Sequence, residues 1–177
     1  MKEGKITIKV QTYESPCGKL ILGTYGEKLC LCDWEDEKRH PKIKKRISKL
    51  LHSEYTIEKS PLLVKVSEEL DEYFSGERQE FDIPLLLLGS EFQKKVWQSL
   101  LSVPYGKTIS YGMLAKEIGD SKSARAVACA NGANAISVFV PCHRVIGSDN
   151  SLTGYGGGLG AKRYLLNLEC GYGLFCL

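Results

Sequence analysis

One cysteine of the chain, Cys142, has a neighbour that could make it reactive. A free thiol has a pKa near ~8.5 and is mostly protonated at neutral pH, so a nucleophilic role requires a base. His143 follows directly and is a candidate for that base, and Glu169 is the carboxylate we choose to fix the tautomer of its imidazole. From residue types alone, Cys142 is either this nucleophile or a small buried hydrophobic residue.

The segment before Cys142 is apolar and rich in β-branched residues. Residues 136–140 therefore predict a buried strand that ends abruptly at Pro141 and delivers the cysteine. Successive side chains of a strand point to opposite faces, so we expect His143 to act through a bend of the backbone or a bridging water. Glu169 would come from a last amphipathic helix that carries Leu165, Leu166 and Leu168.

Short helices joined by glycines are predicted upstream of this strand. Ser90 is a candidate N-cap of a helix that ends before Pro104, a second helix is predicted over 110–118, and a third over 122–131 with Ser121 as its cap. Two short helices across a tight, glycine-containing turn are typical of a helix-turn-helix, a weak signal by itself. Small residues on the third helix permit close approach to another surface: Ala124, Ala126, Ala128 and Ala130.

The first half of the chain has a different pattern. Alternating apolar residues between 6 and 31 predict a small antiparallel meander, and helices are predicted over 38–50 and 61–74, the second ending at Gly76. The first helix is strongly basic, which we interpret as a solvent-exposed face and not as a nucleic-acid site. Residues 81–88 then predict an apolar strand or connector.

Composition limits the class of protein. The chain has 177 residues, 43% hydrophobic and 25% charged, which suits one compact domain or two small ones and excludes disorder and solenoids. The seven cysteines lack the regular spacing of a disulfide framework, which argues against a disulfide scaffold. The N-terminus is polar and the apolar runs are short, so the sequence predicts neither an export signal nor a membrane span. We therefore expect an intracellular protein. Residues 1–88 carry 15 basic and 16 acidic side chains, and residues 89–177 carry 9 and 5, so the second half is the better candidate for a polyanionic partner.

Four ordered segments of the second half resemble the O6-alkylguanine-DNA alkyltransferases, also called methylated-DNA–protein-cysteine methyltransferases. The segments span residues 92–97, 103–111, 123–134 and 141–166, the last with Pro-Cys-His-Arg-Val at 141–145. The resemblance covers residues 89–169, and a looser one covers 15–20. It implies an α+β fold. The scaffold domain at 1–88 would be ribonuclease H-like, with a small antiparallel sheet and helices. It also implies an alkyl-acceptor domain at 89–177, mainly helical with a winged-helix-like helix-turn-helix.

The resemblance implies repair of DNA by direct reversal. Cys142 would take the alkyl group from O6-alkylguanine, and from O4-alkylthymine, in a single irreversible turnover that needs no cofactor. His143 and Glu169 would activate the thiol, and Tyr111 and Lys162 would neutralise the leaving purine. For Tyr111 a plain core aromatic, and for Lys162 a solvated lysine, remain the alternatives. The remaining pocket positions are the carbonyl groups of Cys142 and Val145, the ring of Tyr155, the backbone N–H of Gly156, and Asn134 as a positioning residue.

Double-stranded DNA that contains O6-alkylguanine is the partner that the resemblance implies. The damaged nucleotide must leave the duplex, Arg125 would fill the gap, and the second helix of the pair would lie in the minor groove. Ser123, Ala126 and Ala130 are the other expected DNA contacts. A helix-surface phosphate contact is the alternative role for Arg125. We expect a monomer in the cytoplasm, or in the nucleus of a eukaryote.

Other readings remain at this point. A non-catalytic, alkyltransferase-like lesion-binding protein is the main alternative, although in those proteins the cysteine is commonly a tryptophan. A transcriptional regulator and a cysteine hydrolase are the others. We expect no metal, because Cys17, Cys30 and Cys32 with His40 or His52 do not form a tight ligand pattern. A glycine in the pocket loop, where relatives carry a small side chain, could widen the pocket.

Overall fold

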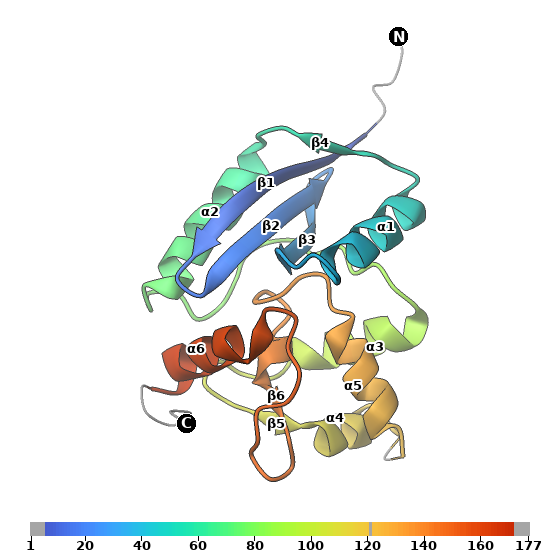
Figure 1. The fold of residues 1–177 in the computed structure, drawn as a ribbon, viewed down its shortest axis with the longest axis vertical. Helices are drawn as coiled ribbons and strands as arrows, with labels where there is room; N and C mark the ends of the chain where they lie inside the picture. The colour runs from blue at the N-terminus through green and yellow to red at the C-terminus, as the bar shows by residue number, and fades with distance from the viewer. Residues whose placement is uncertain (1–5, 121, 172–177) are drawn as a thin grey trace.

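The N-terminal half is built on a four-stranded sheet (Figure 1). The computed structural model describes residues 6–120 and 122–171. Strands β1 (Ile8–Ser15), β2 (Gly18–Tyr25) and β3 (Lys28–Trp34) form the predicted antiparallel meander. Strand β4 (Tyr55–Ile57) pairs in parallel with β1, so the order is β3-β2-β1-β4 and the sheet is mixed. A three-residue strand is too short for its alternation to be read from the sequence.

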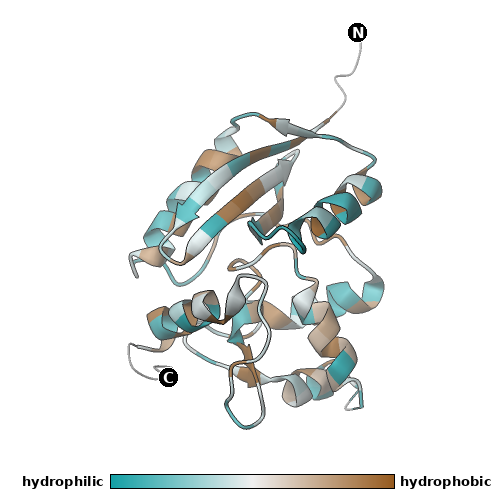
Figure 2. Cartoon of the chain, viewed as in Figure 1, coloured by the Kyte–Doolittle hydropathy of each residue, from teal (hydrophilic) through white to brown (hydrophobic). Residues whose placement is uncertain are grey.

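Two helices cover this sheet where the sequence predicts them. Helix α1 (His40–Leu51) packs against β3 through the buried side chains of Ile43 and Ile47. Helix α2 (Pro61–Phe74) packs against β1 and β2, and the Ser60 side chain caps it by accepting from the Leu63 N–H at 3.1 Å. Most of α1 is coloured as hydrophilic in Figure 2, in contrast to the apolar middle of β2.

The C-terminal half is mainly helical, with helices α3 (Glu91–Leu100), α4 (Tyr111–Glu117), α5 (Ala124–Gly132) and α6 (Gly158–Cys170). Strands β5 (Ile109–Ser110) and β6 (Val145–Ile146) add a short parallel pair. Ser90 caps α3 in a reciprocal capping box with Gln93. Helices α4 and α5 pack on each other across the predicted turn, and α5 begins two residues later than expected, with Ser123 as its N-cap residue. The expected cap Ser121 lies outside the described residues.

The predicted strand over 136–140 is wrong. Ile136 forms one isolated bridge with Cys32, and the chain then turns, with the Val140 N–H bonded to the Ile136 carbonyl at 2.9 Å and Val138 at a φ of 73°. The whole segment is buried, so its β-branched composition reflects burial and not an extended backbone.

The edge of β3 joins the two halves. The Cys32 N–H donates to the Ala135 carbonyl at 2.9 Å, and the Ser137 N–H donates to the Cys32 carbonyl at 2.7 Å. Residues 81–88 form a connector that meets the same strand through the Leu29–Leu85 bridge. Buried apolar residues of both halves form one continuous cluster, and the α+β class is confirmed. In the described part of the chain, no helix combines the length and apolar character that crossing a membrane requires.

Candidate active site

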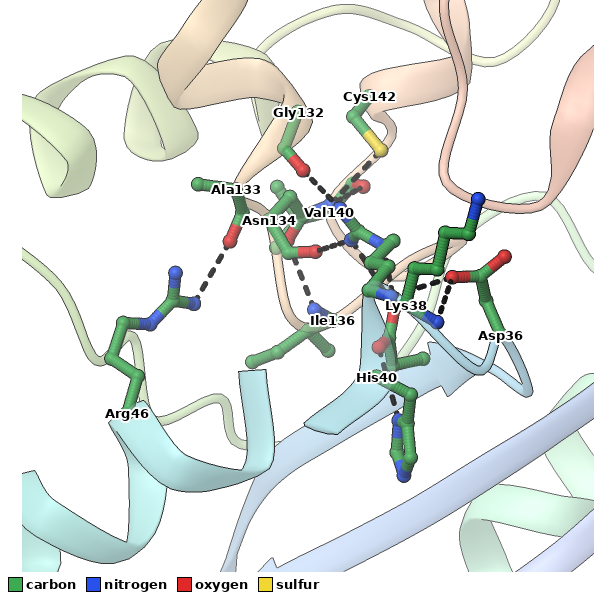
Figure 3. A network of polar contacts seen from close by, with 12 residues as sticks. Asp36, Lys38, His40, Arg46, Gly132, Ala133, Asn134, Ile136, Val140 and Cys142 are labelled. Atoms are coloured by element: carbon green, nitrogen blue, oxygen red, sulfur yellow. Dashed lines mark hydrogen bonds and ion pairs between the residues drawn. The ribbon is translucent and has the colours of Figure 1, made fainter. Parts of the chain in front are cut away.

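Cys142 begins a single turn of 3-10 helix, η1 (Cys142–Arg144), and its side chain is buried. Two asparagines near the C-terminal end of α5, Asn131 and Asn134, hold this turn. Figure 3 shows the contact of Asn134 with Cys142. The Asn134 side-chain amide donates to Cys142 Sγ at 3.1 Å and to the Val140 carbonyl at 2.9 Å, and the Asn131 amide donates to the Cys142 carbonyl at 3.3 Å. The thiol is therefore positioned by α5 and not by a strand.

Burial raises the pKa of the Cys142 thiol, while the hydrogen bond from Asn134 and the charges of Arg39 and Lys162 act in the opposite direction. The net effect is a raised pKa, so the resting thiol is protonated at neutral pH. A base must remove this proton before the sulfur can act as a nucleophile.

His143 and Glu169 form a buried pair beside this thiol. His143 Nε2 and Glu169 Oε1 are 2.7 Å apart, and neither side chain is exposed. Glu169 also accepts from the Tyr73 hydroxyl at 2.6 Å and from Arg144 Nε at 2.8 Å. Burial by itself would raise the pKa of Glu169, but His143 and Arg144 outweigh it and hold this pKa well below its usual value. Glu169 is thus an ionised carboxylate.

The state of Glu169 fixes the tautomer of His143. An ionised carboxylate can only accept hydrogen bonds, so the proton of a neutral imidazole lies on Nε2 and the lone pair on Nδ1. His143 Nδ1 is buried and has no hydrogen-bond partner in the described part of the chain, and no hydrogen bond joins His143 to Cys142 there. The imidazole therefore has a vacant acceptor, the property that a general base requires. The expected placement on opposite faces of a strand is wrong, because the two residues share a 3-10 turn.

Cys142 lines a cavity of about 860 Å³. Tyr111 lies at the start of α4 and lines the same cavity, and its hydroxyl accepts from Thr153 Oγ1 at 3.4 Å. The ring of Tyr155 also borders the cavity and packs edge-on against Trp34, with 5.9 Å between ring centroids. Cavities of this size hold small organic ligands, and a purine base is within that range.

Lys162 is fully buried, so the alternative of a solvated lysine is wrong. Its Nζ donates to the Val145 carbonyl at 2.5 Å and to the Thr153 carbonyl at 2.8 Å. Burial lowers its pKa to about 8. The Val145 carbonyl thus accepts from Lys162, and the Cys142 carbonyl accepts two hydrogen bonds, from the Asn131 side-chain amide and from the Val145 N–H.

Arg39 is a residue of the site that sequence reasoning missed. Its guanidinium donates to the carbonyls of Gly132 and, at 2.6 Å, of Asn134, and it pairs with Asp33 at 3.2 Å. A Cβ on Gly156 would lie 2.6 Å from Arg39 Nε, so this glycine accommodates the arginine and does not simply widen the pocket. No local signal could identify the link, because its partners are more than 90 residues apart in the chain.

Tyr73 and Arg144 were missed as well. Arg144 stands in the Pro-Cys-His-Arg-Val segment but had no assigned role, and it makes two hydrogen bonds to Glu169 and one to the Val103 carbonyl. Tyr73 comes from α2, in the other half of the chain. Their common partner is Glu169, so this carboxylate joins α2, η1 and α6.

The expected DNA contacts differ in exposure. Arg125 and Ala126 are exposed on α5, and Ser123 is half-buried with its hydroxyl bonded to the Asp120 carbonyl at 2.8 Å. Ala130 is 3% exposed, and its carbonyl accepts from Trp97 Nε1 at 2.8 Å. The expectation that Ala130 contacts DNA therefore does not agree with its place in the core, where α5 packs on α3.

No group of three or more His, Cys, Asp or Glu side chains within 6–120 and 122–171 is placed to hold a metal ion.

Comparisons with known proteins give one consistent result. Two family models match the chain: "6-O-methylguanine DNA methyltransferase, ribonuclease-like domain" over residues 8–87, and "6-O-methylguanine DNA methyltransferase, DNA binding domain" over residues 91–171. The chain is 43% identical over 162 residues to the methylated-DNA–protein-cysteine methyltransferase of Mycobacterium tuberculosis, with 92% of each protein covered. It is 40% identical over 164 residues to the constitutive methylated-DNA–protein-cysteine methyltransferase of Bacillus subtilis, with 89% of this chain and 93% of that protein covered. The crystal structure of Mycobacterium tuberculosis OGT in complex with DNA superposes with a TM-score of 0.77 at 42% identity, covering 92% of each chain.

Proposed function

The chain belongs to the 6-O-methylguanine DNA methyltransferase family, and we propose that Cys142 is the residue that accepts the alkyl group. The protein is a DNA repair enzyme that transfers an alkyl group from methylated DNA to a cysteine. The relatives support this activity and not a lesion-binding role without transfer. The observation that carries the assignment is the place of the Cys142 thiol, which lines a cavity large enough for a purine and lies beside the buried His143–Glu169 pair.

The other cysteines of the described chain are less suited to this role. Burial raises the pKa of Cys30 to about 12 and that of Cys32 well above its usual value. Cys129 borders the same cavity but is exposed, and no base of the described chain bonds to it. Cys142 alone among them adjoins a histidine whose acceptor nitrogen is unpaired.

His143 acts as the general base in our proposal. Nδ1 takes the thiol proton, directly or through a water, and Glu169 stabilises the imidazolium that results. The sulfur then forms a bond to the alkyl carbon while the bond from that carbon to O6 breaks. The electron pair of that bond stays on the purine, which takes up a proton and becomes guanine.

Other groups near Cys142 would stabilise the leaving purine. The Tyr111 hydroxyl lines the cavity and would donate to a ring nitrogen. The charge of Lys162 lies close enough to act on Cys142, and it would favour both the thiolate and the negative purine. The backbone N–H of Gly156 would bind the departing oxygen, and the ring of Tyr155 would cover the base.

The product of this reaction is a thioether, which offers no carbonyl group for water to attack. Each molecule therefore acts once, and the damaged DNA supplies the alkyl group without a cofactor. O4-alkylthymine presents the same kind of alkyl–oxygen bond and is a second substrate in our proposal.

The damaged base must leave the duplex to reach Cys142, at a cost of a few kcal/mol. Arg125, exposed on α5, would occupy the gap while α5 lies in the minor groove. We assign residues 89–177 to DNA binding and alkyl transfer, and residues 1–88 to a scaffold that supplies Tyr73 and Arg39 to the site. The protein would act as a monomer in the compartment that holds the DNA, which is the cytoplasm, or the nucleus in a eukaryote.

His143→Gln tests this mechanism. Glutamine still reaches Glu169 but cannot take up a proton, so the single-turnover rate on a duplex with O6-methylguanine should fall by about 10²-fold or more at neutral pH. Raising the pH should restore part of the loss, because hydroxide then ionises the thiol. A rate equal to that of the unaltered protein at pH 7 would exclude His143 as the base, and unchanged lesion binding would show that the fold is intact.

A further inference from the structure

The basic face of α1 borders the cavity that holds Cys142. The cavity is lined by Lys42 and Arg46 of α1 and by Lys38 and Arg39, which directly precede this helix. Its lining also includes Cys129, Ala133 and Cys142. The interpretation of this segment as a solvent-exposed face is therefore incomplete, because part of it faces the C-terminal end of α5. In Figure 3, Arg46 lies to the left of the network and Lys38 to the right, with Asn134 between them.

Two of these cations have structural roles. Arg39 donates to the Gly132 carbonyl, and Arg46 Nη2 donates to the Ala133 carbonyl at 2.8 Å. Both carbonyls lie at the C-terminal end of α5, where the helix dipole favours positive charge. Arg39 and Arg46 thus hold α1 against α5, and their guanidinium groups already have hydrogen-bond partners within the protein.

Lys38 and Lys42 are different. Both side chains are exposed, and neither forms an ion pair within the described part of the chain. The one carboxylate that lines the cavity there, Asp36, accepts from the backbone N–H groups of Lys38 and Arg39 at 3.0 and 2.6 Å. Those hydrogen bonds, with smaller effects from the charges of Arg39 and Lys38, hold the pKa of Asp36 low, so it stays ionised. Within the described residues its carboxylate forms no ion pair with either lysine side chain.

The positive charge on α1 is concentrated. Residues 40–51 contain five lysines and arginines and no carboxylate, in a half of the chain that is otherwise slightly acidic. Lys42 and Arg46 lie four residues apart on α1, and like charges at this spacing repel each other in a helix. A bound polyanion would relieve this repulsion and release counterions.

We propose that Lys38 and Lys42 bind phosphates of the damaged DNA strand next to the extruded nucleotide. The DNA interface would then lie on both sides of the cavity mouth. Helix α5 would lie in the minor groove of the DNA, and the residues at the start of α1 would contact the phosphate backbone. Lysine suits this role, because it binds phosphate as a point charge without reading sequence. The inference rests on the proposed function, since the nucleotide that enters the cavity brings its own strand to the mouth.

The test compares two double variants with equal loss of charge. Lys38→Gln/Lys42→Gln removes the proposed contacts. The control, Lys45→Gln/Lys49→Gln, removes two exposed lysines of α1 that do not line the cavity. Affinity for a duplex with O6-methylguanine is measured against salt concentration. Loss of two phosphate contacts should reduce the slope of log K against log salt by roughly 2. The affinity at low salt should fall about tenfold, and the control double variant should keep the slope of the unaltered protein.

Three results would overturn the proposal. The first is an unchanged slope in Lys38→Gln/Lys42→Gln, and the second is an equal loss in both double variants, which would indicate general attraction and no defined contact. The third is a loss of transfer from the free modified base as large as the loss on duplex, which would indicate damage to the pocket. Failure of the proposed function is separate, because the unaltered protein would then gain no methyl group from the methylated duplex.

Discussion

At the scale of single residues, the chemistry depends on one carboxylate. Glu169 accepts from Tyr73, His143 and Arg144, so it fixes the tautomer of the base and the position of η1 together. The sequence identified Cys142, His143 and Glu169 as a set, because an adjacent Cys-His pair and a distant carboxylate are the residue types that thiol activation requires. It could not identify Tyr73 or Arg39, since only the folded chain brings them to the site.

Removal of the charge of Glu169 should destabilise the fold in a pH-dependent way. Glu169→Gln leaves Arg144 buried without its counter-charge, which costs roughly 3 kcal/mol at pH 7. The pKa of Glu169 is lowered in the folded state, so its stabilisation is present above the unfolded pKa of about 4.5 and is lost as the pH falls toward the folded value. Urea unfolding at pH 7 and at pH 3.5 should show the difference between the two proteins shrinking at acid pH. A difference that is constant across this range would contradict the assignment of an ionised Glu169.

At the scale of elements, the helices were predicted well and the segment that carries the thiol was not. The predicted range of α2 is that of the structure, and α4 lies within about a residue of its predicted ends. Helix α3 begins after its predicted cap Ser90 but ends at Leu100, earlier than the predicted end before Pro104. Residues 136–140 were predicted as a strand, because a short apolar run cannot be distinguished from a buried turn by composition. The short strands β4 and β6 carry no periodic signal at all.

Helix α5 should act on duplex DNA mainly through Arg125. Arg125→Ala should slow repair of duplex O6-methylguanine at least tenfold more than reaction with the free modified base, because only the duplex requires a filled gap. Arg125→Lys separates two roles of this side chain. A simple phosphate contact would survive the change to lysine, whereas a side chain that fills the gap would not be fully replaced. Equal losses on duplex and free base in single-turnover assays would contradict the inserted position of Arg125.

At the scale of the whole molecule, the two halves share one core and one site. Main-chain hydrogen bonds join β3 to residues 135–137. Arg39 bonds to Gly132 and Asn134, and Asn134 in turn bonds to the Cys142 sulfur. Figure 1 shows β3 and α1 directly above the loop that precedes η1. The N-terminal half therefore positions the Cys142 thiol in addition to stabilising the fold.

Loss of the Arg39 link should affect stability and reaction together. Arg39→Met leaves the Asp33 carboxylate, which is fully buried, with His40 as its remaining side-chain partner, and should cost about 2 kcal/mol in urea unfolding. Transfer from the free modified base should also slow, because Asn134 then loses support for its bond to Cys142 Sγ. Arg39→Lys, which keeps the charge but not the fork of donors, should be intermediate. An Arg39→Met protein as stable and as fast as the unaltered one would show that this link is dispensable.

The most direct test of the central claim is the intact mass of the protein after incubation with a duplex that contains O6-methylguanine. We expect a stoichiometric gain of one CH₂ group, mapped by peptide analysis to Cys142, and no gain in Cys142→Ala, which should still bind the lesion. A gain that persists in Cys142→Ala, or repair of the duplex over many turnovers by protein of unchanged mass, would contradict the account.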